Sequence, residues 1–412
     1  MSGAATGRVA VASMTALLGF SIGWCAEVAS ATPAPRIVTL EEALAAAEST
    51  PEVIVAGAIE RIAAAGIRTA KAPAEPSLTL ATKTITARES VALSVPFRWG
   101  GQRFAAVSAA EAELQAANRS RDAAIATSRR VCRVAWFTLA AAEDSLRAAI
   151  DAAARWERNR RALADLFEMQ RASRLDVAQA TAEAVQASAA RASAEKAVVA
   201  ASADLRALLG TDVGRLSAGD ARPTPPPEGP LETWRERARA VSPDVAVAEA
   251  ELHAAEARVT QRARERRPTT SLEAGADWND PTQPGTDAML GLGLTFPTRG
   301  RAAWDAARAE RDRAVARLDL ARRRLEADVE TTWATAVAAR ARFEALDQIA
   351  RPAAVEAVEL TELGYREGKL DLFRILIAQR ALADTERDRA DAYREWGTAY
   401  ADLERLTPGS QP

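Results

Sequence analysis

The chain contains nearly the same residue pattern twice. Residues 49–53 read Ser-Thr-Pro-Glu-Val, and residues 241–245 read Val-Ser-Pro-Asp-Val. Matching positions are Pro51 and Pro243 (192 residues apart), Pro76 and Pro268 (192), 174–177 and 369–372 (195), and 204–205 and 402–403 (198). The slow increase of this offset indicates a duplication with small insertions. The protein is therefore predicted to consist of two copies of one structural unit.

The charge composition argues against a nucleic-acid-binding protein. The 54 Lys and Arg residues are matched by 56 Asp and Glu residues, so the formal net charge is only −2. Nucleic-acid binding would require an excess of positive charge. Aromatic residues make up only 5% of the chain, and the long periodic stretches are rich in Ala, Leu, Arg and Glu, a composition typical of long helices that pack closely through small side chains.

The first 31 residues resemble a secretory signal peptide. A short segment ending in Arg8 precedes the apolar run 9–24, and the small residues 29–31 (Ala-Ser-Ala) form a suitable cleavage site. The alternative is a membrane anchor, but the run has only about 16 residues, fewer than the roughly 20 that a spanning helix needs. We therefore expect export and cleavage after Ala31.

The two cysteines carry little functional information. Lipidation of Cys25 is an alternative to signal cleavage, but Trp24 stands where a lipid-attachment site prefers a small residue. The only other cysteine is Cys132, inside a helical pattern, so no disulfide can form within the mature chain. A lone buried Cys usually acts as a small hydrophobic residue.

Each repeat is predicted to contain one β-hairpin with a single apolar face. The first repeat covers residues 32–221 with strands at about 77–98, and the second covers 231–407 with strands at about 271–297. In both strand regions apolar residues alternate with small or polar ones, which is the period of a strand. The stripe is clearest at Leu290, Leu292, Leu294 and Phe296.

Helical hairpins of unusual length follow the strands, at about 102–209 and 301–406. Their first helices, at about 102–165 and 301–365, would each span roughly 95 Å. The return helices are shorter, and additional helices at about 39–66 and 231–264 supply the missing length. The first of these begins with a capping-box spacing of Thr39 and Glu42. A Pro-rich linker at 222–230 cannot be helical and joins the repeats.

Four strands from one chain cannot close a barrel, and an open sheet edge cannot face lipid. Three chains would supply about twelve strands. Two chains would supply about eight, and a barrel of eight strands is too narrow inside for an open channel. A homotrimer is therefore predicted, with Leu290, Leu292, Leu294 and Phe296 facing lipid. Trp99 and Trp278, near strand ends, fit either an interfacial aromatic girdle or a structural role.

Several segments, in this order, resemble the TolC-type outer-membrane efflux family over residues 37–407. They are Val-Thr-Leu-Glu-Glu-Ala-Leu at 38–44, Pro-Phe-Arg-Trp-Gly-Gly-Gln-Arg at 96–103, and Gly-Tyr-Arg-Glu-Gly-Lys-Leu-Asp-Leu at 364–372. Within this family the chain looks most similar to the CzcC-type branch of cation and metal exporters. The resemblance implies an α+β membrane protein with two tandem repeats, whose trimer forms a 12-stranded β-barrel continued by an α-helical barrel.

The function implied by this resemblance is a passive exit duct of a tripartite efflux system. The duct lies in the outer membrane, contacts its lipid and extends through the periplasm of a Gram-negative cell. An inner-membrane transporter, of the RND type, supplies the energy, and a periplasmic adaptor protein contacts the tips of the helical hairpins. Metal cations are one implied cargo, and a drug-export or type I secretion duct is the alternative within transport.

The resemblance also assigns roles to the turns between the long and return helices. The residues at the adaptor-contact tips are Arg174, Leu175, Gly368, Lys369 and Leu370. Asp176 and Asp371 match acidic positions that constrict the tunnel, and capping of the return helices is their alternative role. Gln179 and Arg374 stand where related channels can carry a second acidic residue, which argues against a doubly acidic gate.

No catalytic, cofactor-binding or metal-binding motif is present in the sequence. His253 is the only histidine, lies among charged residues and has no Cys partner, so a transition-metal site is not expected. There is no phosphate-binding glycine motif and no paired nucleophile and base. The hypothesis from a different class is a soluble periplasmic coiled-coil scaffold or adaptor, with the alternating segments packed internally.

Overall fold

A computed structural model describes residues 35–83, 88–97, 101–211, 214–220, 222–223, 225, 229–278, 285–298 and 300–409. Residues 35–412 form one compact unit, and the two repeats do not separate into independent units. The predicted signal peptide, Cys25, Trp99 and the tips of both strand hairpins lie outside the described residues. Within the described part, no helix combines the length and the apolar character needed to cross a membrane.

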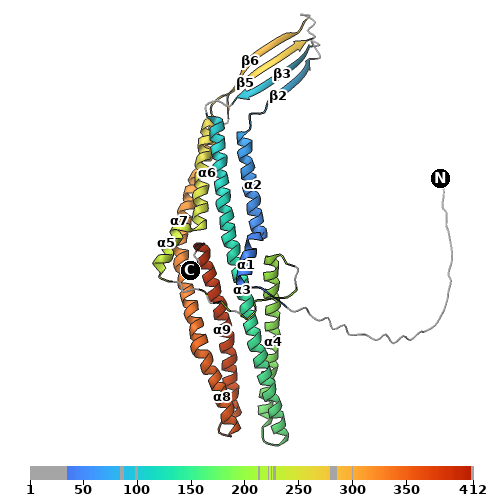
Figure 1. The fold of residues 1–412 in the computed structure, drawn as a ribbon, viewed down its shortest axis with the longest axis vertical. Coiled ribbons are helices and arrows are strands. Elements are labelled where there is room, and N and C mark those ends of the chain that lie inside the picture. The colour runs from blue at the N-terminus through green and yellow to red at the C-terminus, as the bar shows by residue number, and fades with distance from the viewer. Residues whose placement is uncertain are drawn as a thin grey trace, which may run out of the picture. The chain divides into compact units, whose positions relative to one another are not determined.

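Both repeats contain two short helices, a strand hairpin, a long helix and a return helix in the same order, and the first repeat has the additional short elements β1, η1 and β4 (Figure 1). The first repeat contains β1 (Arg36–Ile37), α1 (Leu40–Ala46), η1 (Ala47–Ser49), α2 (Pro51–Lys71), β2 (Ser77–Lys83), β3 (Arg88–Phe97), α3 (Gln102–Glu168), α4 (Arg174–Leu209) and β4 (Leu216–Ser217). The second contains α5 (Leu231–Val241), α6 (Pro243–Glu265), β5 (Thr269–Trp278), β6 (Asp287–Thr295), α7 (Gly300–Ala345), η2 (Leu346–Ala350), α8 (Arg351–Arg366) and α9 (Leu372–Leu406). The predicted fold class of two tandem repeats, each a strand hairpin followed by a long helical hairpin, is confirmed.

The short helices of each repeat are interrupted, although the sequence pattern predicts continuous ones. Each interruption falls immediately before a proline, since α2 begins at Pro51 and α6 begins at Pro243. Proline lacks a backbone N–H and is well accommodated only in the first helical turn. At the start of α1, Thr39 accepts a hydrogen bond from the Glu42 amide at 3.2 Å, as predicted. The Glu42 carboxylate pairs with Arg36.

The long helix of the second repeat contains one turn of different geometry. Residues Leu346–Ala350 form a π-helix between α7 and α8, whereas α3 is a single α-helix of 67 residues. Pro352 lies directly after this turn and leaves a backbone carbonyl of the preceding turn without its usual donor. A π-turn, in which each hydrogen bond spans one residue more than in an α-helix, accommodates this missing hydrogen bond while the helix continues. The helical period alone predicts an uninterrupted helix here.

The four strands of the two hairpins form one antiparallel sheet in the order β2-β3-β5-β6. The register aligns one apolar row across all four strands: Leu78, Leu93, Ala274 and Leu290 are cross-strand neighbours. Since side chains alternate between faces, the opposite face carries small and polar residues such as Ser94, Glu273 and Gly291. The sheet lies at one end of α2, α3, α6 and α7 (Figure 1).

The repeats are interlocked through α3, which packs against α2 and α4 of its own repeat and against α6 and α9 of the other. The main core lies where α3 and α9 meet and contains the aromatic rings of Trp136, Phe137 and Tyr393, all at most 2% exposed. Gly397 of α9 lies against Phe137, where a Cβ atom would come within 2.2 Å of the ring. Only glycine permits this close approach, which joins the two repeats midway along their helices.

Candidate functional site

The apolar face of the sheet is exposed. The four predicted lipid-facing residues Leu290, Leu292, Leu294 and Phe296 are 76%, 75%, 61% and 68% exposed. Three lie in β6, and Phe296 follows its last residue. On the other edge strand, Leu78 and Leu80 are 64% and 72% exposed. A contiguous apolar face of this kind on a folded protein marks a surface that contacts another partner.

The turn between α3 and α4 is closed by a reciprocal capping arrangement. Ser173 accepts a hydrogen bond from the Asp176 amide at 3.1 Å, while the Asp176 carboxylate accepts from the Ser173 amide at 2.9 Å and hydroxyl at 2.7 Å. These contacts satisfy backbone donors that the first turn of a helix leaves free. Asp176 thus makes the capping contacts considered in the sequence analysis.

The equivalent turn between α8 and α9 uses a simpler cap. Asp371 precedes α9, and its carboxylate accepts a hydrogen bond from the Arg374 amide at 3.2 Å. The Arg374 side chain makes no ion pair among the described residues, whereas Lys369 pairs with Glu367 at 2.6 Å. The two turns therefore present both charge signs, and the predicted constriction residues Asp176 and Asp371 both serve as helix caps.

Exposed apolar side chains surround these turns. Leu175 is 65% exposed, Met169 65%, Phe373 60% and Leu370 38%. The predicted tip residues Arg174 and Lys369 are exposed beside them. Side chains of this kind are available for contact with another protein.

Both turns place one residue in the left-handed backbone region. This residue is Gly368 in the second repeat (φ 71°) and Gln170 in the first (φ 59°). The left-handed region costs a residue with a Cβ about 1–2 kcal/mol.

We expect Gln170→Gly to raise the free energy of unfolding by up to about 1 kcal/mol, and Gly368→Gln to lower it by a similar amount. Thermal unfolding followed by circular dichroism would measure both; a change of the same sign in the two variants would contradict this reasoning.

A polar link joins the two helical hairpins above the turns. Asn159 of α3 donates to the Gln379 side-chain carbonyl of α9 at 2.8 Å, and the Gln379 amide donates to Glu362 of α8 at 3.4 Å. Gln379 is only 2% exposed, so breaking the link would leave a buried amide without partners. A second contact, between Arg380 of α9 and Glu183 of α4, joins the same hairpins. No local sequence pattern predicts that these residues meet.

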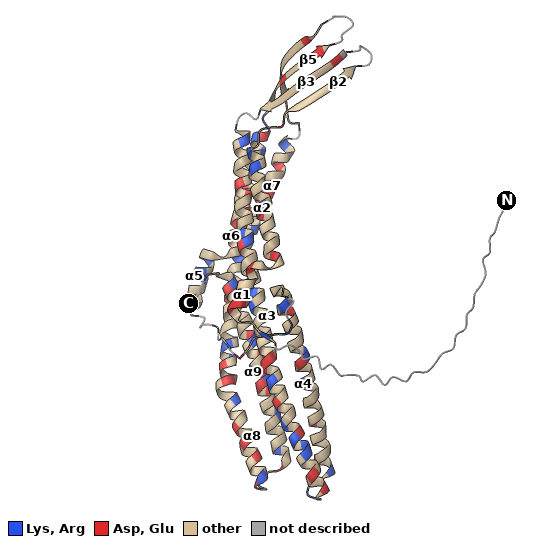
Figure 2. Ribbon diagram, turned by 45° about the vertical axis from the view of Figure 1, so that its right-hand side comes forward, with Lys and Arg blue, Asp and Glu red and all other residues tan. Residues whose placement is uncertain are grey.

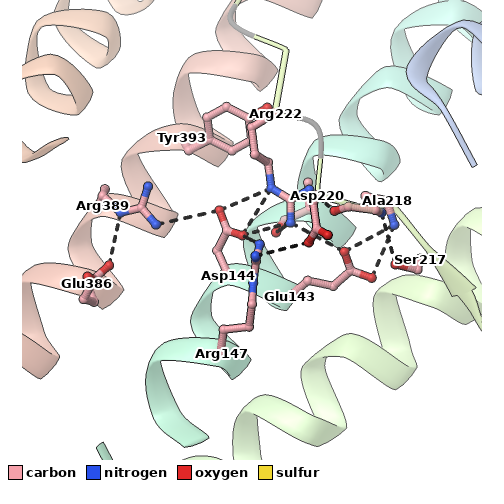
Figure 3. Close-up of polar contacts among 12 residues, drawn as sticks. Glu143, Asp144, Arg147, Ser217, Ala218, Asp220, Arg222, Glu386, Arg389 and Tyr393 are labelled. Carbon is pink, nitrogen blue, oxygen red and sulfur yellow. Dashed lines mark hydrogen bonds and ion pairs between the residues drawn. The ribbon is translucent and has the colours of Figure 1, made fainter. Parts of the chain in front are cut away.

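A larger polar cluster joins the repeats at their linker (Figure 3). Its centre is Asp144 of α3, whose side chain is 6% exposed and forms ion pairs with three arginines. They are Arg147 on the same helix, Arg222 of the linker at 2.8 Å and Arg389 of α9 at 3.9 Å. The structure therefore concentrates three positive charges around one buried carboxylate.

The linker is held at further points of this cluster. Tyr393 of α9 donates its hydroxyl to the Pro223 carbonyl at 2.9 Å, and burial raises the pKa of this hydroxyl above its usual value. Arg389 also pairs with Asp347 in the π-turn at 3.3 Å. We call Asp144, Arg147, Arg222 and Arg389 the clasp, because they connect α3, the linker and α9.

The remaining titratable residues form no recognisable chemical site. No group of three or more His, Cys, Asp or Glu residues suited to a metal ion occurs within the described ranges. His253 is exposed on α6. Cys132 is fully buried, and burial raises the pKa of its thiol, which keeps it protonated and unreactive.

Comparison with known proteins agrees with this architecture. Residues 234–409, which include α6 to α9 and strands β5 and β6, match the model of the outer membrane efflux protein family. Residues 234–409 therefore carry an outer membrane efflux protein domain. The family predicted from the sequence is thereby confirmed for this part of the chain, while the CzcC-type branch stays a prediction. No curated protein matches the chain in sequence.

Solved structures extend the similarity to both repeats. A membrane protein from Pseudomonas aeruginosa is 20% identical, with a TM-score of 0.74 over 89% of this chain and 93% of that one. CusC is 16% identical, with a TM-score of 0.74 over 91% and 94%. The outer membrane protein VceC from Vibrio cholerae is 19% identical, with a TM-score of 0.70 over 90% and 97%. The fold of the whole described chain is therefore that of such proteins.

Proposed function

We propose that this protein is the passive exit duct of a tripartite efflux system in the outer membrane. The observation that carries the proposal is the exposed apolar face of the four-stranded sheet, in a chain with an outer membrane efflux protein domain. A soluble coiled-coil scaffold would bury this face. Strands that present apolar residues to one side and small or polar residues to the other are suited to separating lipid from a channel.

The duct is proposed to be a homotrimer. Strands β2 and β6 are the free edges of the sheet, and lipid cannot satisfy their backbone groups. Pairing the β6 edge of one chain with the β2 edge of the next removes both edges, and three chains supply about twelve strands. Exposed apolar residues along α2, such as Ile59 and Ile62 at 50% and 71%, are further surfaces that neighbouring chains would cover.

The helical tips are proposed to contact a periplasmic adaptor, which links the duct to an inner-membrane transporter of the RND type. Leu175 and Leu370, with the adjacent Arg174, Gly368 and Lys369, form the proposed contact. The buried link between Asn159 and Gln379 would hold the tips together, and the adaptor would have to weaken it when the duct opens.

Metal cations are the proposed cargo, as in the CzcC-type branch that the sequence resembles. A drug or protein duct is the competing assignment. Measuring the tolerance of a deletion strain to panels of metals and drugs distinguishes these assignments. Unchanged metal tolerance would contradict the proposed cargo but not the proposed duct.

We also propose that Asp176 and Asp371 constrict the channel at the helical tips. This role can be tested without removing the helix caps. Asn caps a helix about as well as Asp but carries no charge, so Asp176→Asn with Asp371→Asn isolates the electrostatic role. We expect this variant to lower single-channel conductance in planar bilayers about twofold at 0.1 M salt. The difference should largely disappear at 1 M salt, where charges are screened within roughly 3 Å.

The matched control is Asp384→Asn, an exposed residue farther along α9 that pairs with Arg387 at 3.5 Å, and its conductance should equal that of the wild type. Unchanged conductance in the double variant would mean that the two carboxylates act only as caps. Recovery of the mature wild-type protein in the soluble periplasm, with no heat-modifiable trimer, would overturn the duct and favour the scaffold.

A further inference from the structure

Positive charge is concentrated where the helices meet the sheet. The ends of α2, α3, α6 and α7 nearest the strands, residues 68–71, 102–108, 262–267 and 300–308, carry nine cationic and two acidic residues. Figure 2 shows these Lys and Arg residues at the helix ends beside the sheet. We call the nine the basic collar: Arg68, Lys71, Arg103, Arg262, Arg264, Arg266, Arg267, Arg301 and Arg308. The collar contrasts with the balanced charge of the whole chain.

Helix capping explains only part of the collar. α2 and α6 end at the sheet, and cations in the last turn of a helix interact favourably with its dipole. α3 and α7 begin at the sheet, where the dipole favours acidic residues instead. Neither has an acidic residue in its first turn, and the turns carry Arg103 and Arg301. The helix dipole therefore does not explain the positive charge at these two helix ends.

Ion pairing within the chain neutralises only part of the collar, since Arg262 pairs with Glu265 at 2.6 Å and Lys71 with Glu111 at 3.9 Å. Arg264 and Arg301 make no ion pair with any described carboxylate, and Arg103 donates to the Lys71 backbone carbonyl. Arg266 and Arg308 stack on Trp304, with guanidinium carbons 5.2 Å and 4.8 Å from the ring centre. Stacking orients a guanidinium without cancelling its charge. The exposed N–H groups are thus left available for an external anion.

Farther from the sheet the charges are balanced: residues 309–330 of α7 carry six arginines and six acidic residues, and several arginines pair with carboxylates of neighbouring helices. Arg258 of α6 pairs with Glu113 of α3 at 2.7 Å, and Arg322 of α7 pairs with Glu249 of α6 at 2.8 Å. The local excess of positive charge at the sheet is therefore not a general property of these arginine-rich helices.

The collar adjoins exposed aromatic and apolar side chains. Phe104, in the first turn of α3, is 80% exposed, and Phe296, directly after β6, is 68% exposed. Beyond them lies the apolar face of the sheet. A band of cations next to aromatic residues and then an apolar surface has the order of a membrane interface, where anionic headgroups lie beside the hydrocarbon layer.

We propose that the basic collar binds the headgroups of anionic phospholipids in the leaflet that faces the helices. This inference rests on the proposed function, because it requires the sheet to lie in the membrane. Arg264, Arg301 and Arg308 would donate to lipid phosphates, while Phe104 and Phe296 contact the first acyl carbons. The described strand ends at the far end of the sheet show no such excess of positive charge, because Lys83 and Arg88 lie there together with Glu89, Asp277 and Asp287. The charge distribution thus favours the leaflet on the helix side.

The test compares lipid binding to the full-length trimer in neutral detergent by native mass spectrometry. The collar variant is Arg264→Gln, Arg301→Gln and Arg308→Gln. Its control is Arg313→Gln, Arg323→Gln and Arg324→Gln, which removes three exposed arginines from α7 that have no ion pair among the described residues. Phosphatidylglycerol and phosphatidylcholine are added separately.

We expect the wild type and the control to bind phosphatidylglycerol at least tenfold more tightly than phosphatidylcholine, since each basic residue near an anionic lipid surface contributes favourably. The collar variant should lose this preference, and a triple Arg→Lys variant should retain most of it. Equal phosphatidylglycerol binding by collar variant and wild type would overturn the inference, as would an equal loss in the control.

The proposed function is tested separately in the same preparations. Single-channel conductance in a neutral-lipid bilayer does not depend on anionic headgroups, so the collar variant should conduct like the wild type. A wild-type trimer that conducts but shows no preference for phosphatidylglycerol would overturn only the inference about the collar. A protein with no conductance in any variant would instead count against the duct.

Discussion

Leu290→Arg is expected to abolish assembly of the protein in the outer membrane. Leu290 lies near the middle of β6, is 76% exposed and belongs to the apolar row that crosses all four strands. An arginine facing lipid near the middle of the bilayer costs about 2–4 kcal/mol per substitution. A trimer would incur this cost three times, so we expect at least a tenfold loss of heat-modifiable trimer in the outer-membrane fraction.

The preceding residue provides a matched control. Met289 lies on the same strand, is 56% exposed and points to the opposite face, where it pairs in register with Gly275. Met289→Arg adds the same charge to the small and polar face, and we expect at least half of the wild-type amount of trimer. Similar assembly of the two variants would contradict the assignment of the apolar face to lipid.

The duplication and the strand faces could be predicted because both are encoded locally. An alternation of period two along Leu290, Leu292 and Leu294 already defines one face of a strand, and the same pattern recurs in the other repeat. The long helices could also be predicted, since few prolines interrupt the helical pattern of these segments. The observed helices differ from the predicted ones at prolines. Pro51 and Pro243 begin new helices, and Pro352 follows a π-turn.

The clasp could not be predicted, because its members are distant in the sequence. Asp144 and Arg389 are 245 residues apart and meet only because α9 packs against α3. In the sequence, Asp144 resembles the many solvated carboxylates of an arginine-rich helix, and no local signal distinguishes it. The link between Asn159 and Gln379 was missed for the same reason, since only the packed helices show that Gln379 is buried.

Removing the central carboxylate of the clasp is expected to destabilise the helices strongly. In Asp144→Ala, Arg222 and Arg389, whose side chains are 18% and 22% exposed, lose a buried partner. The remaining carboxylates compensate only partly: Glu143 lies 3.6 Å from Arg222, and Asp347 and Glu386 lie 3.3 Å and 3.2 Å from Arg389. Breaking a buried ion pair by removing one partner typically costs 3–5 kcal/mol. We expect about 3 kcal/mol here, measured by denaturant unfolding of the detergent-solubilised protein.

The cluster contains its own control. Asp220 also pairs with Arg147, at 3.4 Å, but its side chain is 99% exposed. Exposed pairs contribute about 0–1 kcal/mol, so Asp220→Ala should unfold like the wild type. A double-mutant cycle of Asp144→Ala with Arg222→Met then measures their coupling, because the double variant also removes the Arg222 guanidinium, which the single variant leaves without its Asp144 partner. We expect the double variant to be more stable than Asp144→Ala alone. Equal unfolding of Asp144→Ala and Asp220→Ala would mean that packing of α3 on α9, not the clasp, holds the linker between the repeats.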